Sequence, residues 1–117
     1  MVKNTNRLAR VKDLAVLLSN VDKQTMKILL QSLSVRAIDN VCEMFFNIIS
    51  NPDQLPKKSR TKLKRLLSKH KQACLLISNK EKKCSERRQI LVEQSGTGII
   101  TSIVMAAIPL ITSLLSR

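Results

Sequence analysis

Aromatic residues are almost absent from this sequence of 117 residues, which contains no Trp, no Tyr and only two Phe, Phe45 and Phe46. Proteins that bind single-stranded nucleic acids stack exposed bases on aromatic side chains. This chain is therefore not expected to bind single strands by stacking. Any nucleic-acid binding should be directed at phosphates and should not depend on base sequence.

Residues that break helices are also scarce, since the chain has two Gly and three Pro. This scarcity favours long helices over hairpins, and no segment shows the alternation of a strand. The chain has three cysteines, Cys42, Cys74 and Cys84, an odd number whose spacing is not that of a disulfide framework. We therefore expect reduced thiols in a reducing compartment. The sequence predicts an all-α protein, a small helical bundle with a basic helix and a hydrophobic C-terminal helix.

Apolar residues recur at helical spacing through the first half of the chain. The clearest stripe predicts a helix over 35–50, capped by Ser34. A helix over 5–19, capped by Thr5 or Asn6, and a second helix capped by Asp22 precede it. Three regions follow from these patterns: an amphipathic bundle region over 1–56, a basic helix and linker over 57–94, and a glycine hinge with a hydrophobic tail over 95–117.

Positive charge is concentrated in one block of the chain. Residues 57–88 carry thirteen bases and two acids, whereas residues 1–56 have a net charge of +2. The block predicts a basic helix over 57–79, and 80–88 either continues it or forms a polar link. Such a block implies a polyanionic partner, either nucleic-acid phosphates bound without sequence preference or an anionic membrane. The predicted polyanion-binding residues are Lys57, Lys58, Arg60, Lys62, Lys64, Arg65, Lys69, Lys71, Lys82, Lys83, Arg87 and Arg88.

The C-terminal segment has no charged side chain from Ile99 to Ser116. As a helix it would reach roughly 27 Å, just short of a hydrocarbon core of about 30 Å. Pro109 is expected to kink it. The segment fits a tail anchor, a membrane-active helix that could also self-associate, or the central buried helix of a bundle. The predicted membrane-contacting residues are Ile99, Ile100, Ile103, Val104, Leu110, Ile111, Leu114 and Leu115.

Catalytic and metal-binding patterns are not found. His70 and Cys74 are four residues apart and share a helix face, but no second histidine and no Cys-x-x-Cys pair completes a zinc pattern. No carboxylate has a recognisable place to orient a Cys–His pair. We predict a protein that is not an enzyme and uses no metal or cofactor.

The order of basic and apolar segments resembles that of proteins in a viral family. The acid-poor run 62–67, the apolar residues 75–77 and the run Glu86-Arg-Arg-Gln-Ile-Leu-Val-Glu-Gln94 precede a glycine break and an apolar end. This layout is similar to small proteins encoded beside capsid genes in Maverick/Polinton elements and adintoviruses. The resemblance implies a minor virion protein, comparable to adenovirus core or membrane-active proteins, that contacts capsid proteins. In the infected cell it would lie in the cytoplasm or nucleus, in part on membranes.

The resemblance also implies maturation by an adenain-type protease between Thr97 and Gly98. Gln94 departs from the aliphatic residue that such a site requires. The alternative for Gly96 and Gly98 is a helix end and hinge. Two other functions stay open from the sequence: a cellular tail-anchored helical protein, or a helical interaction module with the tail inside its core.

Overall fold

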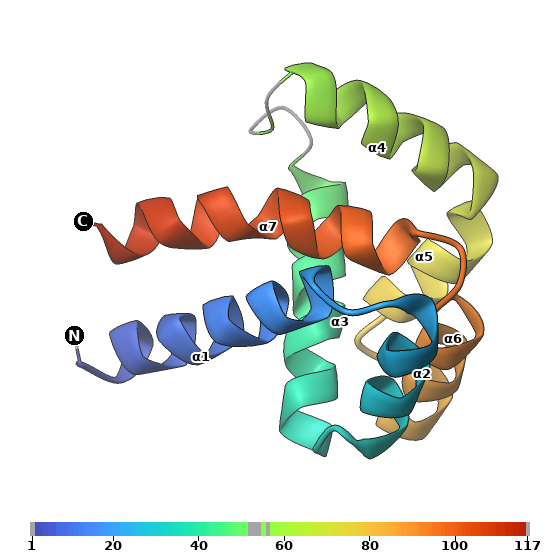
Figure 1. Ribbon diagram of the computed structural model, residues 1–117, viewed down its shortest axis with the longest axis horizontal. Helices are drawn as coiled ribbons and strands as arrows, with labels where there is room; N and C mark the ends of the chain where they lie inside the picture. Colours follow the sequence, from blue (N-terminus) through green and yellow to red (C-terminus); the bar gives the residue numbers. More distant parts are fainter. Residues whose placement is uncertain (1, 52–54, 56, 117) are drawn as a thin grey trace.

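The computed structural model describes residues 2–51, 55 and 57–116. Within these residues the chain forms seven helices and no strand, which confirms the predicted all-α fold (Figure 1). The helices are α1 (Val2–Ser19), α2 (Lys23–Ser32), α3 (Val35–Ser50), α4 (Lys57–Lys69), α5 (Lys71–Ser78), α6 (Cys84–Glu93) and α7 (Ile99–Leu115).

Side-chain caps fix the starts of α2 and α3 as the sequence predicts. The carboxylate of Asp22 accepts a hydrogen bond from the Thr25 backbone N–H at 2.7 Å, and this bond lowers the pKa of Asp22. The Ser34 hydroxyl accepts from the Ala37 N–H at 3.1 Å. The predicted bounds of α3 are confirmed. The first helix was expected from residue 5, but α1 already begins at Val2.

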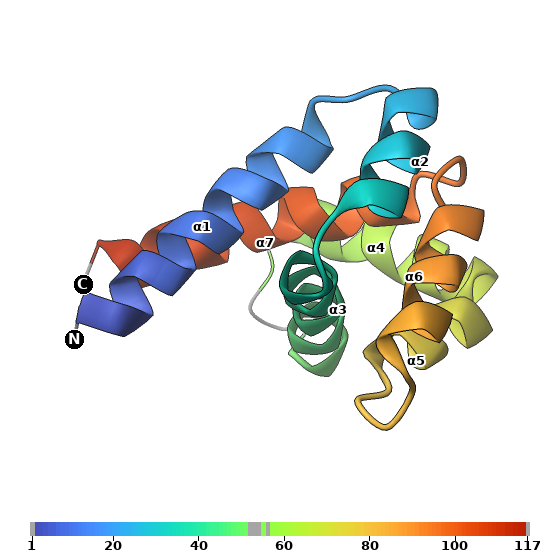
Figure 2. The ribbon, with the colours of Figure 1, turned by 90° about the horizontal axis from the view of Figure 1, so that it is seen from below.

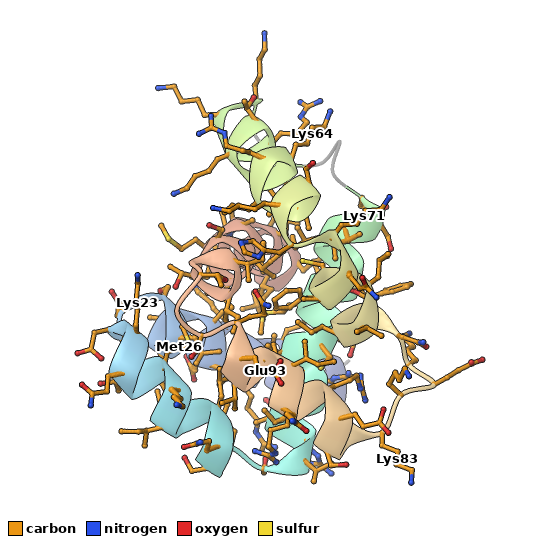
Figure 3. All side chains as sticks on the ribbon, turned by 90° about the vertical axis from the view of Figure 1, so that its right-hand side faces the viewer. Lys23, Met26, Lys64, Lys71, Lys83 and Glu93 are labelled. Carbon is orange, nitrogen blue, oxygen red and sulfur yellow. The ribbon has the colours of Figure 1, made fainter. Side chains whose placement is uncertain are left out.

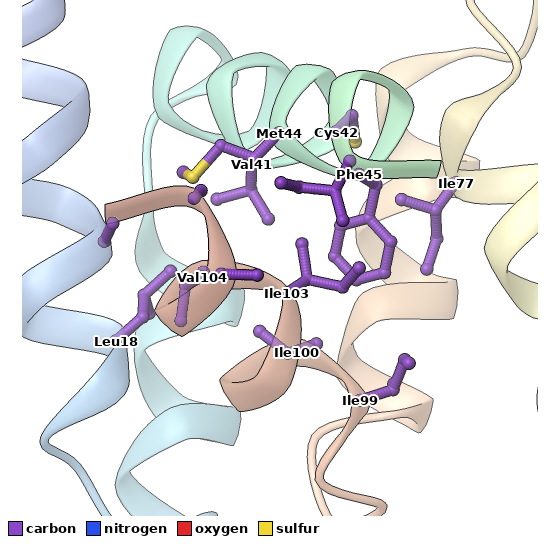
Figure 4. Packing of buried hydrophobic residues seen from close by; sticks show 14 of the residues in the cluster. Leu18, Val41, Cys42, Met44, Phe45, Ile77, Ile99, Ile100, Ile103 and Val104 are labelled. Carbon is purple, nitrogen blue, oxygen red and sulfur yellow. The ribbon is translucent and has the colours of Figure 1, made fainter. Parts of the chain in front are cut away.

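α7 is the central helix of the bundle. It lies beside α1 and runs in the opposite direction, so the two termini lie at the same end of the molecule (Figures 1 and 2). Ile99, Ile100 and Ile103 are buried, and they meet Phe45 of α3 and Ile77 of α5 in one cluster (Figure 4). The Cα radius of gyration, 13.4 Å, is that of a compact chain of this length, about 13 Å. The predicted regions 1–56, 57–94 and 95–117 all contribute residues to this core.

Pro109 lies inside α7, and the helix continues through it to Leu115. Proline has no N–H to donate to the carbonyl of Met105, one turn earlier. Both residues are exposed, so water can take the place of the missing donor. The proline is thus tolerated on the solvent side of the central helix.

The predicted helix over 57–79 is interrupted at His70. Its backbone leaves the helical region (φ −118°, ψ 31°) and separates α4 from α5. The interruption lets two apolar faces point in different directions: Leu63 of α4 lies against α7, while Cys74 and Ile77 of α5 face α3 and α6. One straight helix could not cover both surfaces.

The polar run after α5 is a link followed by the start of a helix. Residues 79–83 connect α5 to α6, which begins at Cys84. A second turn separates α6 from α7. Gly98 takes a left-handed conformation there (φ 87°), which glycine adopts without strain. The glycine break therefore turns the chain sharply, so that α7 runs back across the bundle beside α1 (Figure 1).

Candidate polyanion-binding surface

α4 is an amphipathic helix at one end of the molecule. Its apolar side, with Leu63 buried and Leu66 and Leu67 partly buried, packs on the core next to α7. The opposite side faces solvent, and Figure 3 shows its side chains spreading away from the other helices. The packing of the leucines fixes which side of α4 is presented to a partner.

The solvent side of α4 carries a set of cations with no acid among them. Its exposed bases are Lys57, Lys58, Lys62, Lys64, Arg65 and Lys69. Arg60 is partly buried at the edge of this set, and Lys71 extends it at the start of α5. No Asp or Glu occurs between residues 57 and 71. We call the six exposed bases the basic face of α4. At neutral pH it is a dense cluster of positive charge.

Two rows make up the basic face. At about 100° per residue, Lys58, Lys62, Arg65 and Lys69 form one row, and the second row, Lys57 and Lys64, is centred about 120° away around the helix. Between the rows, directly opposite Leu63, are the exposed residues Thr61 and Ser68. We call this pair the hydroxyl crest. Neither residue was among the predicted binding residues, although their seven-residue spacing within the basic run was a signal that they share one face.

Arg87 and Arg88 belong to the structure of the bundle. Arg87, whose side chain is only 12% exposed, forms an ion pair with Asp39 of α3 at 3.0 Å. Arg88 donates to the carbonyl of Leu30 at 2.8 Å, in the last turn of α2. A signal was present in the sequence, because both arginines lie within one turn of the buried Leu91 and so share its face. These two guanidinium groups join α6 to α3 and α2.

Arg88→Met is expected to lower the free energy of unfolding by about 1.5–3 kcal/mol. The substitution removes the hydrogen bond from the guanidinium group to the Leu30 carbonyl, which has no helical partner at the end of α2. DNA affinity at a temperature where the variant is folded should be unchanged. Chemical denaturation and a DNA titration measure the two quantities. A loss of DNA affinity without a loss of stability would show that Arg88 contacts DNA.

The two predicted lysines before α6 lie apart from α4. Lys82 is within 3.9 Å of Glu86, and Lys83 is exposed at the far side of the molecule from Lys64 (Figure 3). The link also places the Lys80 ammonium 4.7 Å from the centre of the Phe46 ring. The twelve predicted residues therefore divide into one continuous group on α4 and α5 and separate positions around α6.

The other arginine-rich surface, between α1 and α3, contains two carboxylates beside its three arginines. Arg7 pairs with Glu43 at 2.6 Å, and Asp39 lies beside Arg7, Arg10 and Arg36 in a polar cleft. These carboxylates offset part of the positive charge of the group, whereas the basic face of α4 contains no acid. The basic face of α4 is therefore the stronger candidate for a polyanion.

The predicted membrane-contacting residues lie largely inside the protein. Ile99, Ile100, Ile103, Val104 and Ile111 are buried, Leu110 and Leu115 are partly buried, and Leu114 is 47% exposed. Of the three alternatives for this segment, the structure adopts the central buried helix. No helix in the described residues combines the length and apolarity needed to cross a bilayer.

Two of the thiols, those of Cys42 and Cys74, are buried and held in their protonated form. Burial raises the pKa of Cys42 and of Cys74 to about 11, so both are neutral at physiological pH. His70 is partly buried at the junction of α4 and α5. Among the described residues, no three His, Cys, Asp or Glu side chains come together as metal ligands.

Thr97 and Gly98, the predicted cleavage position, form the turn into α7. The Thr97 hydroxyl donates to the Gln94 carbonyl at 2.9 Å and accepts from the Ile99 N–H at 3.3 Å. Thr97 is exposed, and Gly98 is partly exposed. These bonds hold the turn that joins α6 to α7, and cleavage there stays a prediction.

No family model matches the chain, and neither a curated protein nor a solved structure matches it.

Proposed function

We propose that this protein is a non-enzymatic nucleic-acid-binding protein that holds phosphates, without sequence preference, on the basic face of α4. The observation that carries the proposal is a run of eight bases without an acid over 57–71, seven of them on α4, whose apolar side is already packed. Lys and Arg that neutralise phosphates release condensed counterions, and this release drives sequence-independent binding.

Packing within the bundle favours nucleic acid over lipid. An amphipathic helix binds a membrane by inserting its apolar side among the acyl chains. In α4 that side is occupied by contacts with α7, and the outward side offers only cations and hydroxyls. α7 likewise buries most of its apolar side chains in the bundle. Both helices would have to give up core contacts to enter lipid.

The test is a fluorescence-anisotropy titration of 30-base-pair DNA in two unrelated sequences, between 50 and 200 mM NaCl. With about six phosphate contacts, affinity is expected to fall about a thousandfold over this range, equally for both sequences. The variant K58Q/K62Q/K64Q/K69Q should flatten the slope of log K against log salt by about 3.6.

The matched control K23Q/K27Q/K80Q/K83Q removes the same charge from α2 and the α5–α6 link, and it should leave the slope nearly unchanged. Binding that does not respond to salt, or that falls equally in both variants, contradicts the proposal. Stronger binding to phosphatidylserine vesicles than to DNA would mean that the basic face binds anionic membranes and not nucleic acid.

The resemblance to capsid-neighbouring proteins of Polinton-like elements supports a place for this activity in a virion, as a minor core protein. There the protein would coat packaged DNA beside the capsid. We expect it to co-purify with particle DNA and to crosslink to that DNA through α4 lysines. Its absence from purified particles would remove this part of the proposal and leave DNA binding untouched.

A further inference from the structure

The arrangement of cations on α4 distinguishes between kinds of nucleic acid. A flat anionic surface or a single strand can meet only one side of a helix at a time. α4 has a row of cations on each side of its exposed surface, with the two small residues of the hydroxyl crest between them. Such a helix can contact two lines of phosphates together if those lines flank it.

The major groove of B-form DNA provides that geometry. The groove is about 12 Å wide and about 8.5 Å deep, and a helix with its side chains is about 10–12 Å across. A helix in the groove has a phosphate backbone on either side and base edges beneath it. Long Lys and Arg side chains reach the backbones, and small crest residues allow the helix to approach the groove floor.

The dimensions of α4 suit this placement. Its thirteen residues reach roughly 20 Å along the helix axis. The row from Lys58 to Lys69 places four cations over about 16 Å, a length in which one DNA strand presents about five phosphates. The leucines that attach α4 to the bundle lie directly opposite the crest, so the body of the protein stays outside the groove.

We propose that α4 binds duplex B-form DNA by lying in the major groove, with its two rows of cations on the two phosphate backbones and Thr61 and Ser68 toward the groove floor. This inference rests on the proposed function, since it specifies which nucleic acid the basic face holds. A-form RNA duplexes are excluded as partners of equal affinity, because their major groove is too narrow and deep.

The first test removes two cations from one row at a time. K57Q/K64Q and K58Q/K69Q should each flatten the salt slope for duplex DNA by about 1.8, because both rows contact phosphates. The control K23Q/K27Q, which changes two exposed lysines of α2, should have little effect. If one row proves dispensable, the protein binds one backbone only, and the groove placement is overturned while salt-dependent DNA binding stands.

The second test fills the crest. T61W/S68W places two bulky rings where the helix should meet the groove floor and should weaken duplex binding at least tenfold. Single-stranded DNA binding should be unchanged or stronger, because the added rings can stack on bases. Q31W, at an exposed position of α2, is the control, and thermal melting of each variant confirms that it is folded.

The third test compares ligands of one sequence. Duplex DNA should bind at least tenfold more tightly than the matching RNA duplex at the same salt concentration. Equal affinity for the two duplexes, or an unaffected crest variant, overturns the groove placement but not the proposed function. A wild-type protein that shows no salt-sensitive binding to any nucleic acid overturns both.

Discussion

Ile103→Asp is expected to unfold the protein, whereas Met105→Asp, two residues along the same helix, should leave the fold intact. Ile103 has no exposed surface and lies beside Phe45 of α3 in the core (Figure 4), while Met105 is 56% exposed. An unpaired carboxylate at position 103 would have to be desolvated with no cation nearby, which costs several kcal/mol. A domain of this size has only about 5–15 kcal/mol of total stability.

Far-UV circular dichroism with thermal denaturation measures this difference. The Ile103→Asp variant should lack a cooperative transition at 25 °C and above, and the Met105→Asp variant should melt within a few degrees of the wild type. Equal, small effects of the two substitutions would mean that α7 is not packed in the bundle. That result would restore the membrane-contacting alternative for the C-terminal segment.

Phe45→Ala should lower the free energy of unfolding by about 3–5 kcal/mol, since it removes a ring with no exposed surface from the centre of the core. Its neighbour provides the matched control. Phe46 is 40% exposed, and its ring contacts the Lys80 ammonium, so Phe46→Ala should cost only about 1 kcal/mol.

Urea denaturation of the two phenylalanine variants, with midpoints and slopes fitted separately, gives both free energies. The order of the two costs is the decisive result. If Phe46→Ala proves the more damaging substitution, the assignment of the two faces of α3 is wrong, and with it the position of α7 against that helix.

Local chemistry made α2 and α3 predictable from the sequence. Ser34 and Asp22 supply acceptors for the free N–H groups of a first helical turn, and the apolar stripe of 35–50 repeats at helical spacing without interruption. Both signals are contained within one element. They need no knowledge of what the helix packs against.

The break at His70 depends on tertiary packing and could not be predicted. No glycine or proline marks it, and the apolar stripe runs through it from Leu63 to Ile77. The chain bends there because the leucines of α4 and the apolar residues of α5 cover different neighbours. Local propensity is overridden by the shape of the core.

Whether α7 lies in the protein core or in a membrane could not be predicted, for a different reason. A helix that is apolar on most sides fits a protein interior and a bilayer equally well, since both environments exclude water. The candidate site shows a similar limit, because an arginine that joins two helices and one that meets a phosphate look alike in an acid-poor run. Composition located the basic face of α4. The position of Arg87 and Arg88 on the face of Leu91 was a signal that separates them from it, but only packing shows that Leu91 is buried and what the two arginines bind.

The pairing of α1 with α7 has a consequence for the folding of the nascent chain. About 80 residues separate the end of α1 from the start of α7. At a synthesis rate of about 5–20 residues per second, the first helix waits for roughly 4–16 seconds before its main partner exists. Leu18, and then Phe45 and Ile77 as each is synthesised, have no α7 to cover them in that interval, so the growing polypeptide exposes hydrophobic surface of the kind that chaperones bind.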